Sequence, residues 1–191
     1  MTSAESAPQV VAATIDSYVT GQSLVTTSGR NASSIVNAPE ALGGRRRANI
    51  ILFDEGTLSL TIGGGQAAYK LEGKGGQAAQ IGWLWYVDPS GPIPPVDLTV
   101  GGRYSAFHID VLELTEPAVV QVDALDAYNR FDSVMTIVDR PGQTLVYPFS
   151  TFISPSEPVK LDFRRIIGVQ VEFDLHNRKA GALKLGPLRV A

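Results

Sequence analysis

Hydrophobic and polar residues alternate with a period of two along much of this 191-residue chain. The clearest case places Phe107, Ile109 and Val111 on one side of an extended segment, with His108 and Asp110 on the other. A strand that is buried on one face has this pattern. No window of about a dozen residues shows the apolar spacing of i, i+3, i+4 and i+7 that an amphipathic helix requires. The pattern therefore predicts strands and favours an all-β fold.

Glycine, proline, asparagine and aspartate residues divide the chain into short extended segments. We expect the polar stretch 28–47 to form a long loop. The proline-rich stretch 88–95 should form a surface connection between two halves of the fold, because proline cannot donate a hydrogen bond to a sheet. Short helical turns are expected only at 149–153 and 161–165. The predicted strands are 10–19, 24–27, 49–53, 57–62, 67–72, 79–87, 104–114, 118–125, 133–138, 144–147, 168–175 and 182–190.

This succession of strands with no helix between them excludes an alternating βαβ architecture. It predicts an all-β fold with two packed antiparallel sheets, a β-sandwich of the jelly-roll type. Sandwiches of this length commonly fold as one unit. We therefore expect a single domain over residues 9–191, preceded by a flexible N-terminal arm at residues 1–8.

Composition excludes several classes of partner and chemistry. The formal net charge of -3 and the pI near 5.4 argue against nucleic acid or anionic lipid as a partner. No stretch approaches the roughly 18 consecutive apolar residues that span a membrane, so we expect no membrane span. The absence of cysteine removes disulfides and thiol chemistry. Residues 1–8 do not resemble a signal peptide, so we expect either a cytoplasmic protein or one whose signal has been removed.

The sequence contains no recognisable catalytic or metal-binding constellation. The histidines His108 and His176 have no partner at ligand spacing, and no Gly-x-Ser-x-Gly motif is present. Asp123, Asp126 and Asp132 are near enough in sequence for a structural calcium site, but they match no calcium-binding loop, and aspartates are common in turns. We therefore expect a protein that is not an enzyme and that has no cofactor.

The chain has one basic run, Arg45-Arg46-Arg47, which follows two glycines. Three adjacent guanidinium groups could bind a phosphate or a carboxylate. A solvated loop that enters a strand is the alternative and the commoner case. The sequence leaves both interpretations open.

A tryptophan-rich strand carries the best candidates for ligand binding. Within it, Trp83 and Trp85 project to one face and Tyr86 to the other. If the tryptophan face is exposed, the two indoles form a platform on which the apolar faces of sugar rings can stack. If it is turned inward, they belong to the core, which is the commoner place for tryptophan. Tyr128 and Arg130 lie between two strands, where they could line a ligand-binding loop or form a turn.

Both ends of the chain resemble galactose-binding-like jelly-roll domains. Toward the C-terminus, the runs 146–152 (VYPFSTF), 161–166 (LDFRRI) and 167–173 (IGVQVEF) are similar to the "pFssF" turn, the "adf..I" turn and the "gaIqfef" strand of such domains. Toward the N-terminus, 15–23 (IDSYVTGQS) and 42–46 (LGGRR) resemble an "idsF.tGsq" strand followed by an "lGGeR" stretch. The order of the motifs agrees, so the resemblance spans most of the chain.

Such domains occur in carbohydrate-binding modules, in the complex I intermediate-associated family and in secreted bacterial proteins of the PEP-CTERM type, which carry a C-terminal sorting tail. The resemblance implies a jelly-roll fold, a glycan partner and an extracellular or cell-surface location. Two features depart from the pattern. The last strand reads LKLGPL at 183–188 in place of the aspartate-bearing "DiaiDnI", which puts a calcium or ligand role of that strand in doubt, and no sorting tail follows Ala191.

Two hypotheses of function follow. The first is a non-catalytic, secreted or surface-associated domain that binds a polysaccharide or another glycan. The second is a structural jelly-roll protein that self-associates into a filament, shell or extracellular matrix through its edge strands or its N-terminal arm. Binding to polysaccharides tests the first hypothesis, and a monomer over a wide concentration range would count against the second.

Overall fold

The structure of the protein is a computed structural model that describes residues 14–53, 55–73, 80–86, 93–153, 159–175 and 180–191, with the backbone alone at 80–86. Within these residues the chain forms strands and short 3₁₀ turns and no α-helix, as the alternation predicts. The turns are η1 (Leu42–Gly44) and η2 (Phe149–Thr151). The strands are β1 (Thr14–Asp16), β2 (Gln22–Thr27), β3 (Arg30–Asn37), β4 (Arg45–Leu52), β5 (Thr57–Gly63), β6 (Gln66–Glu72), β7 (Gln80–Tyr86), β8 (Ala106–Leu114), β9 (Ala118–Asp126), β10 (Phe131–Val138), β11 (Thr144–Pro148), β12 (Ile166–Leu175) and β13 (Gly181–Val190).

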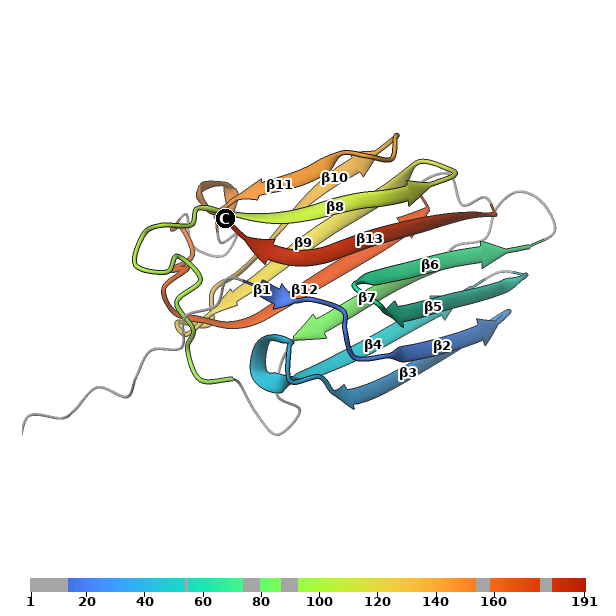
Figure 1. Ribbon diagram of the computed structural model, residues 1–191, viewed down its shortest axis with the longest axis horizontal. Coiled ribbons are helices and arrows are strands. Elements are labelled where there is room, and N and C mark those ends of the chain that lie inside the picture. The colour runs from blue at the N-terminus through green and yellow to red at the C-terminus, as the bar shows by residue number, and fades with distance from the viewer. Residues whose placement is uncertain (1–13, 54, 74–79, 87–92, 154–158, 176–179) are drawn as a thin grey trace, which may run out of the picture.

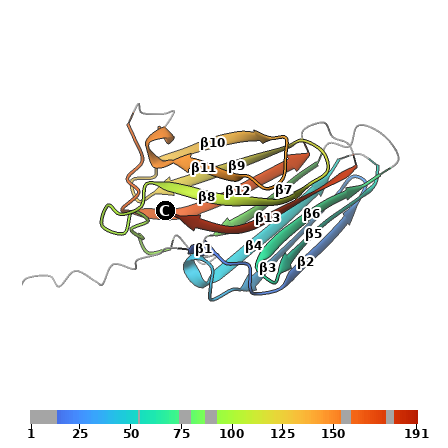
Figure 2. The same cartoon turned by 45° about the horizontal axis from the view of Figure 1, so that its top comes forward.

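Two antiparallel sheets pack face to face and confirm the predicted β-sandwich (Figures 1 and 2). The larger sheet has the order β11-β8-β13-β6-β5-β2, with β1 also paired to β13. The smaller sheet has the order β10-β9-β12-β7-β4-β3. In each sheet order, strands from the second half of the chain lie on one side and strands from the first half on the other. The two groups meet where β12 pairs with β7 and β13 pairs with β6. The described strands therefore share one core.

The core lies between the sheets, where every second residue of each strand points inward. Leu58 and Leu60 of the larger sheet and Val120 and Val122 of the smaller sheet are fully buried. Aromatic rings connect the two sheets: Tyr69 of β6 meets Phe173 of β12 edge to face, with 4.9 Å between the ring centroids. The opposite, solvent-side residues of the smaller sheet form the surface described below.

The polar stretch 28–47 is not the long loop that its composition predicts. It contains the edge strand β3, a tight turn at η1 and the start of β4. The prediction is wrong because β3 turns only the small residues Ala32, Ser34 and Val36 toward the core, so its alternation is faint. In η1, Gly43 has a φ of +75°, and a Cβ there would lie 2.6 Å from Cγ2 of Ile93. The turn therefore requires glycine.

The first predicted strand, 10–19, is also shorter than expected. Strand β1 ends at Asp16, whose Oδ1 accepts a hydrogen bond of 2.8 Å from the backbone N–H of Tyr18. This contact bends the chain into an Asx turn. Tyr18 then takes a φ of +57°, which no strand can continue. Residues 10–13 lie outside the described part of the chain.

Arg46 neither binds an external anion nor lies in a solvated loop. Its side chain and that of Asp16 are both fully buried, and Nη1 lies 2.7 Å from Oδ2 of Asp16. Nε donates to Oε1 of Gln22 at 2.9 Å, and Nη2 donates to the carbonyl of Thr20. Burial raises the pKa of Asp16, although the adjacent guanidinium opposes this effect. Arg46 thus joins β4 to β1, to β2 and to the segment between them. Its neighbours Arg45 and Arg47 are the exposed members of the run.

Several smaller expectations have mixed outcomes. The helical turn expected at 149–153 is η2, whereas 161–165 forms a turn closed by a bond from Arg165 N–H to the carbonyl of Asp162. The proposed N-terminal arm, His176 and most of the connection 88–95 lie outside the described residues. In the part of the chain that is described, no helix has the length and apolar character needed to cross a membrane.

Candidate functional site on the smaller sheet

The solvent side of the smaller sheet, called the outer face here, is built from rows of residues that cross the strands. Residues paired in register on neighbouring antiparallel strands share a face, so the pairing defines these rows. From β10 to β3, the first row is Ser133, Asp123, Gln170, Trp85, Arg47 and Ile35, and the second is Met135, Gln121, Glu172, Trp83, Asn49 and Ser33.

The register assigns the predicted aromatic residues of β7 to two different sides of the strand. The backbone positions of Trp83 and Trp85 pair with Glu172 and Gln170, which belong to the outer face. The position of Tyr86 pairs with Val169, which is buried in the core. The side chains of β7 lie outside the described part of the structure.

A nearly buried carboxylate organises one half of the first row. Asp123 is only 2% exposed and accepts a hydrogen bond of 2.8 Å from Nε2 of Gln121 and one of 2.6 Å from Nε2 of Gln170. Ser133 adds a third side-chain bond. Burial raises the pKa of Asp123, and these three bonds partly oppose the effect. Each glutamine is held by one N–H and keeps its carbonyl oxygen and second N–H for other partners.

Glu172 lies beside this cluster and directly next to the position of Trp83. Its pKa is raised, first because the carboxyl group is half-buried and then because Asp123 and Asp174 add negative charge nearby. Like charges at close range make ionisation of Glu172 unfavourable. On the other side of β7, the second row continues with Asn49, which is nearly buried. The outer face therefore presents carboxyl and amide groups on the β12 side of the two tryptophan positions, and an amide and a guanidinium group on the β4 side.

The remaining predicted site residues, Tyr128 and Arg130, lie in the connection from β9 to β10, at one end of the sandwich. The exposed Tyr128 ring is flanked by two guanidinium groups, Arg130 at 4.8 Å and Arg165 at 5.1 Å from the ring centroid. Arg130 Nε donates to the fully buried Asp126 at 2.7 Å. The five predicted residues thus fall into separate places and do not form one site.

The aspartates considered for calcium are engaged separately. Asp123 holds the two glutamines, and Asp126 accepts bonds from Arg130 and from the N–H groups of Tyr128 and Asp162. Asp132 accepts a bond of 2.7 Å from the N–H of Ile153. Among the described residues, no three His, Cys, Asp or Glu side chains are arranged to hold a metal ion.

Sequence reasoning missed the polar residues of the outer face. The available signal was the alternation itself, because Gln170 and Glu172 interrupt the apolar run Val169, Val171 and Phe173 at every second position. That signal identifies a solvent-side face on β12. It does not say that β9 and β7 are the neighbours, and only the pairing of strands far apart in sequence brings Asp123 to Gln170.

Comparisons with known proteins identify no family for this chain. No protein-family model matches it, and no curated protein matches it. Among solved structures, it is similar to a family 11 carbohydrate-binding module from Clostridium thermocellum in complex with a β-1,3-1,4-mixed-linked tetrasaccharide, with 14% identity, 95% of this chain and 96% of that chain covered, and a TM-score of 0.46. It is also similar to a thermostable variant of the Cel12A cellulase of Rhodothermus marinus, with 11% identity, coverage of 89% and 99%, and a TM-score of 0.44.

Proposed function

We propose that this protein is a non-catalytic glycan-binding domain, located outside the cell or at its surface, whose ligand lies across the outer face of the smaller sheet. The observation that carries the proposal is the pair of rows in which Glu172, Gln170, Asn49 and Arg47 flank the positions of two tryptophans. Aromatic rings and fixed polar groups side by side are what a sugar ring requires. Its C–H face stacks on an aromatic ring while its hydroxyl groups form hydrogen bonds at the edge.

The positions of the tryptophans favour an extended ligand over a single sugar. Strand β7 lies inside the smaller sheet, with β12, β9 and β10 on one side and β4 and β3 on the other. Neighbouring strands are about 4.8 Å apart, so the rows extend about 24 Å from β10 to β3. Trp83 and Trp85 are separated by about 7 Å along the strand, the repeat of two residues. The two rows together offer room for an oligosaccharide that crosses the strands.

The state of Asp123 favours binding over hydrolysis. A glycosidase needs two carboxyl groups that reach opposite sides of the scissile bond. Asp123 and Glu172 are the nearest such pair in the two rows, but Asp123 is nearly inaccessible and is held by Gln121, Gln170 and Ser133. A carboxylate bound in this way orients its neighbours and is not free to attack or protonate a sugar. Asp123 therefore serves as a support for the two amide groups.

The proposal is tested by titrating the whole protein with neutral oligosaccharides in a calorimeter. The β-1,3-1,4-mixed-linked tetrasaccharide, β-1,4-galactotriose and agaro-oligosaccharides form the first set of probes. We expect binding of at least one of them, with no release of reducing ends on prolonged incubation. Loss of that binding in Trp85→Ala, with retention in Tyr128→Ala, would support the outer face as the site. Equal binding by Trp85→Ala and the unchanged protein would contradict it.

A second candidate function, self-association, is favoured by the edge strand β10. Three apolar side chains on its solvent side are exposed: Phe131, Met135 and Ile137. An exposed apolar edge strand is a common route to pairing between chains. Small-angle scattering from micromolar to millimolar concentration tests this candidate. Concentration-dependent oligomers that disappear in Met135→Lys would support it, and a monomer throughout would contradict it.

A further inference from the structure

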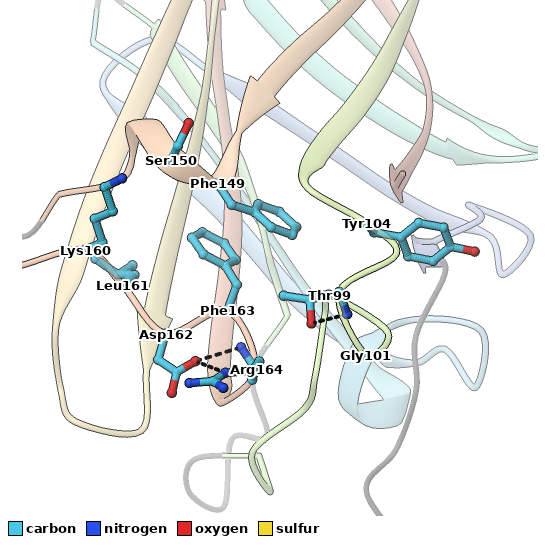
Figure 3. Close-up of a pocket in the computed structure, with 11 residues that line it drawn as sticks. Thr99, Gly101, Tyr104, Phe149, Ser150, Lys160, Leu161, Asp162, Phe163 and Arg164 are labelled. Atoms are coloured by element: carbon cyan, nitrogen blue, oxygen red, sulfur yellow. Dashed lines mark hydrogen bonds and ion pairs between the residues drawn. The ribbon is translucent and has the colours of Figure 1, made fainter.

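A pocket lies at the end of the sandwich that carries the C-terminus, away from the rows of the outer face (Figures 1 and 3). The pocket has a volume of about 510 Å³. Three segments form its walls: the loop 97–105, the turn η2 and the segment 159–165. Pockets of this size accommodate small organic ligands. No residue of the two rows lines it.

Backbone hydrogen bonds hold the three walls together. Leu98 N–H donates to the carbonyl of Phe163 at 2.9 Å, and Phe149 N–H donates to the carbonyl of Ser105 at 2.7 Å. The carboxylate of Asp97 closes the loop 97–105 by accepting bonds from Thr99 and from the N–H of Gly101. A ligand would therefore enter a site that is already formed, which lowers the entropic cost of binding.

Two largely buried phenylalanine rings form the floor of the pocket, and Ser150 provides a hydroxyl group at its side. Phe149 and Phe163 stack with 3.9 Å between ring centroids and 5° between planes. Figure 3 shows these rings at the centre of the pocket, with Ser150 and Lys160 to one side and Thr99 to the other. A ligand that fits this lining has an apolar surface on one side and hydroxyl groups at its edge. A sugar ring has both.

The charge around the pocket is opposite to that of the protein as a whole. The chain carries a formal net charge of -3. The charged residues that line the pocket, by contrast, are Lys160, Arg164 and Asp162. Asp162 is already bonded to Nε of Arg164 at 3.0 Å, and Asp97 is occupied by its own loop. Lys160 is exposed at the pocket and makes no ion pair within the described residues. Excess positive charge there attracts an anion.

We infer that this pocket binds an acidic sugar, a hexuronate, with its ring over the floor and its carboxylate at Lys160. A carboxylate paired with an ammonium group forms a charge-assisted hydrogen bond, stronger than a bond between neutral groups. A simple anion would form a bond with Lys160 but would leave the apolar floor and the hydroxyl group of Ser150 without a partner. A neutral sugar would leave the positive rim unused. This pocket is separate from the outer face, so the proposal of hexuronate binding here and the proposal of glycan binding there can be disproved independently.

Chemical shift perturbation with glucuronate, glucose and acetate as separate probes tests the inference on the whole protein. We expect glucuronate to bind, to weaken as salt is added, and to shift amide signals of 97–105 and 159–165. Glucose and acetate should each bind at least tenfold more weakly. Equal binding of glucose would overturn the role of the charge, and equal binding of acetate would overturn the assignment to a sugar.

Three variants locate the binding. Lys160→Gln should weaken glucuronate about tenfold, the size expected for loss of a charge-assisted bond. Lys184→Gln, which removes a lysine paired with Glu113 on the larger sheet, is the matched control and should bind as the unchanged protein does. Ser150→Ala removes a hydroxyl without altering charge and should weaken glucuronate more than acetate. Unchanged affinity in Lys160→Gln, or loss of affinity in Asp123→Ala on the outer face, would overturn the inference.

Discussion

Nε2 of Gln170 donates a hydrogen bond of 2.6 Å to Oδ2 of Asp123, and this contact joins β12 to β9 across the outer face. The two residues are 47 positions apart in the chain. Gln121 binds the other oxygen of the same carboxylate from the same face. A single nearly buried aspartate therefore fixes two amide groups beside the positions proposed to stack against sugar.

Replacing Asp123 should weaken glycan binding more than it weakens the fold. Asp123→Ala releases the amides of Gln121 and Gln170, so any glycan that binds the outer face should lose at least tenfold in affinity. The free energy of unfolding should fall by about 1–3 kcal/mol, the usual cost of removing one partner from hydrogen bonds to a charged group. Calorimetric titration and urea denaturation measure the two effects. Asp139→Ala, an exposed aspartate in the turn after β10, is the control and should change neither.

Glu172→Gln should stabilise the protein at pH 7 while reducing glycan affinity. Because burial and the charges of Asp123 and Asp174 raise the pKa of Glu172, the folded state disfavours its ionised form. The free energy of unfolding of Glu172→Gln should exceed that of the unchanged protein by on the order of 1 kcal/mol at neutral pH. It should disappear as the pH falls below the ordinary glutamate value of 4.5, where the group is protonated in both states. Thermal melts between pH 7 and pH 3 would contradict this if Glu172→Gln were less stable at pH 7.

The buried pair of Arg46 and Asp16 should be essential for folding of the N-terminal part of the sandwich. Asp16→Ala leaves the guanidinium of Arg46 without its carboxylate and should cost about 3–5 kcal/mol of unfolding free energy. Arg47→Ala removes the exposed neighbour on the same strand and should stay within about 0.5 kcal/mol. Denaturant titrations compare the two. Equal and small losses would show that the buried pair contributes little.

Asp126 should give the protein a stabilising contribution that is lost in acid. Burial alone would raise the pKa of Asp126, but bonds from Arg130 and from the backbone N–H groups of Asp162, Arg130 and Tyr128 outweigh it, so the pKa lies below its ordinary value. A lowered pKa stabilises the fold above about pH 4 and ceases to do so as the pH falls through the folded-state value. Asp126→Asn should be less stable by about 2 kcal/mol at pH 7. The difference in stability between Asp126→Asn and the unchanged protein should narrow in thermal melts below pH 4. A difference that stays constant with pH would contradict the stabilising role of the ionised Asp126.

The fold class followed from the sequence because alternation of apolar and polar residues is a local property of each strand. Strand β3 could not be predicted from the sequence, because small residues such as Ala32 and Ser34 make an edge strand resemble a loop. The role of Arg46 was equally hidden, since its partner Asp16 is 30 positions away. The two N-terminal segments that resemble galactose-binding-like domains contain these two residues, and in the structure they form a buried ion pair that supports the fold.

The candidate site could be predicted only in part. The alternation around Trp83 and Trp85 predicted that both would share one face, and it left open which face that was. The pairing of β7 with Glu172 of β12 and with Asn49 of β4 assigns the two tryptophan positions to the outer face. This assignment requires knowing which strands neighbour β7, and these strands are distant from it in sequence. The sequence also predicts Tyr128 and Arg130 as ligand-binding residues, because an aromatic ring and a guanidinium group between two strands are typical of a binding loop. The topology separates these two residues from the tryptophans, since the connection from β9 to β10 lies at the end of the sandwich.

Intrinsic fluorescence tests the central claim most directly, because Trp83 and Trp85 are the two tryptophans of the sequence. Emission and acrylamide quenching therefore report on β7 alone. We predict that acrylamide quenches both indoles readily in the folded protein, and that a glycan that binds the outer face reduces this quenching. Blue-shifted emission that resists acrylamide until the protein is unfolded would show that both indoles are buried, and it would contradict glycan binding on the outer face.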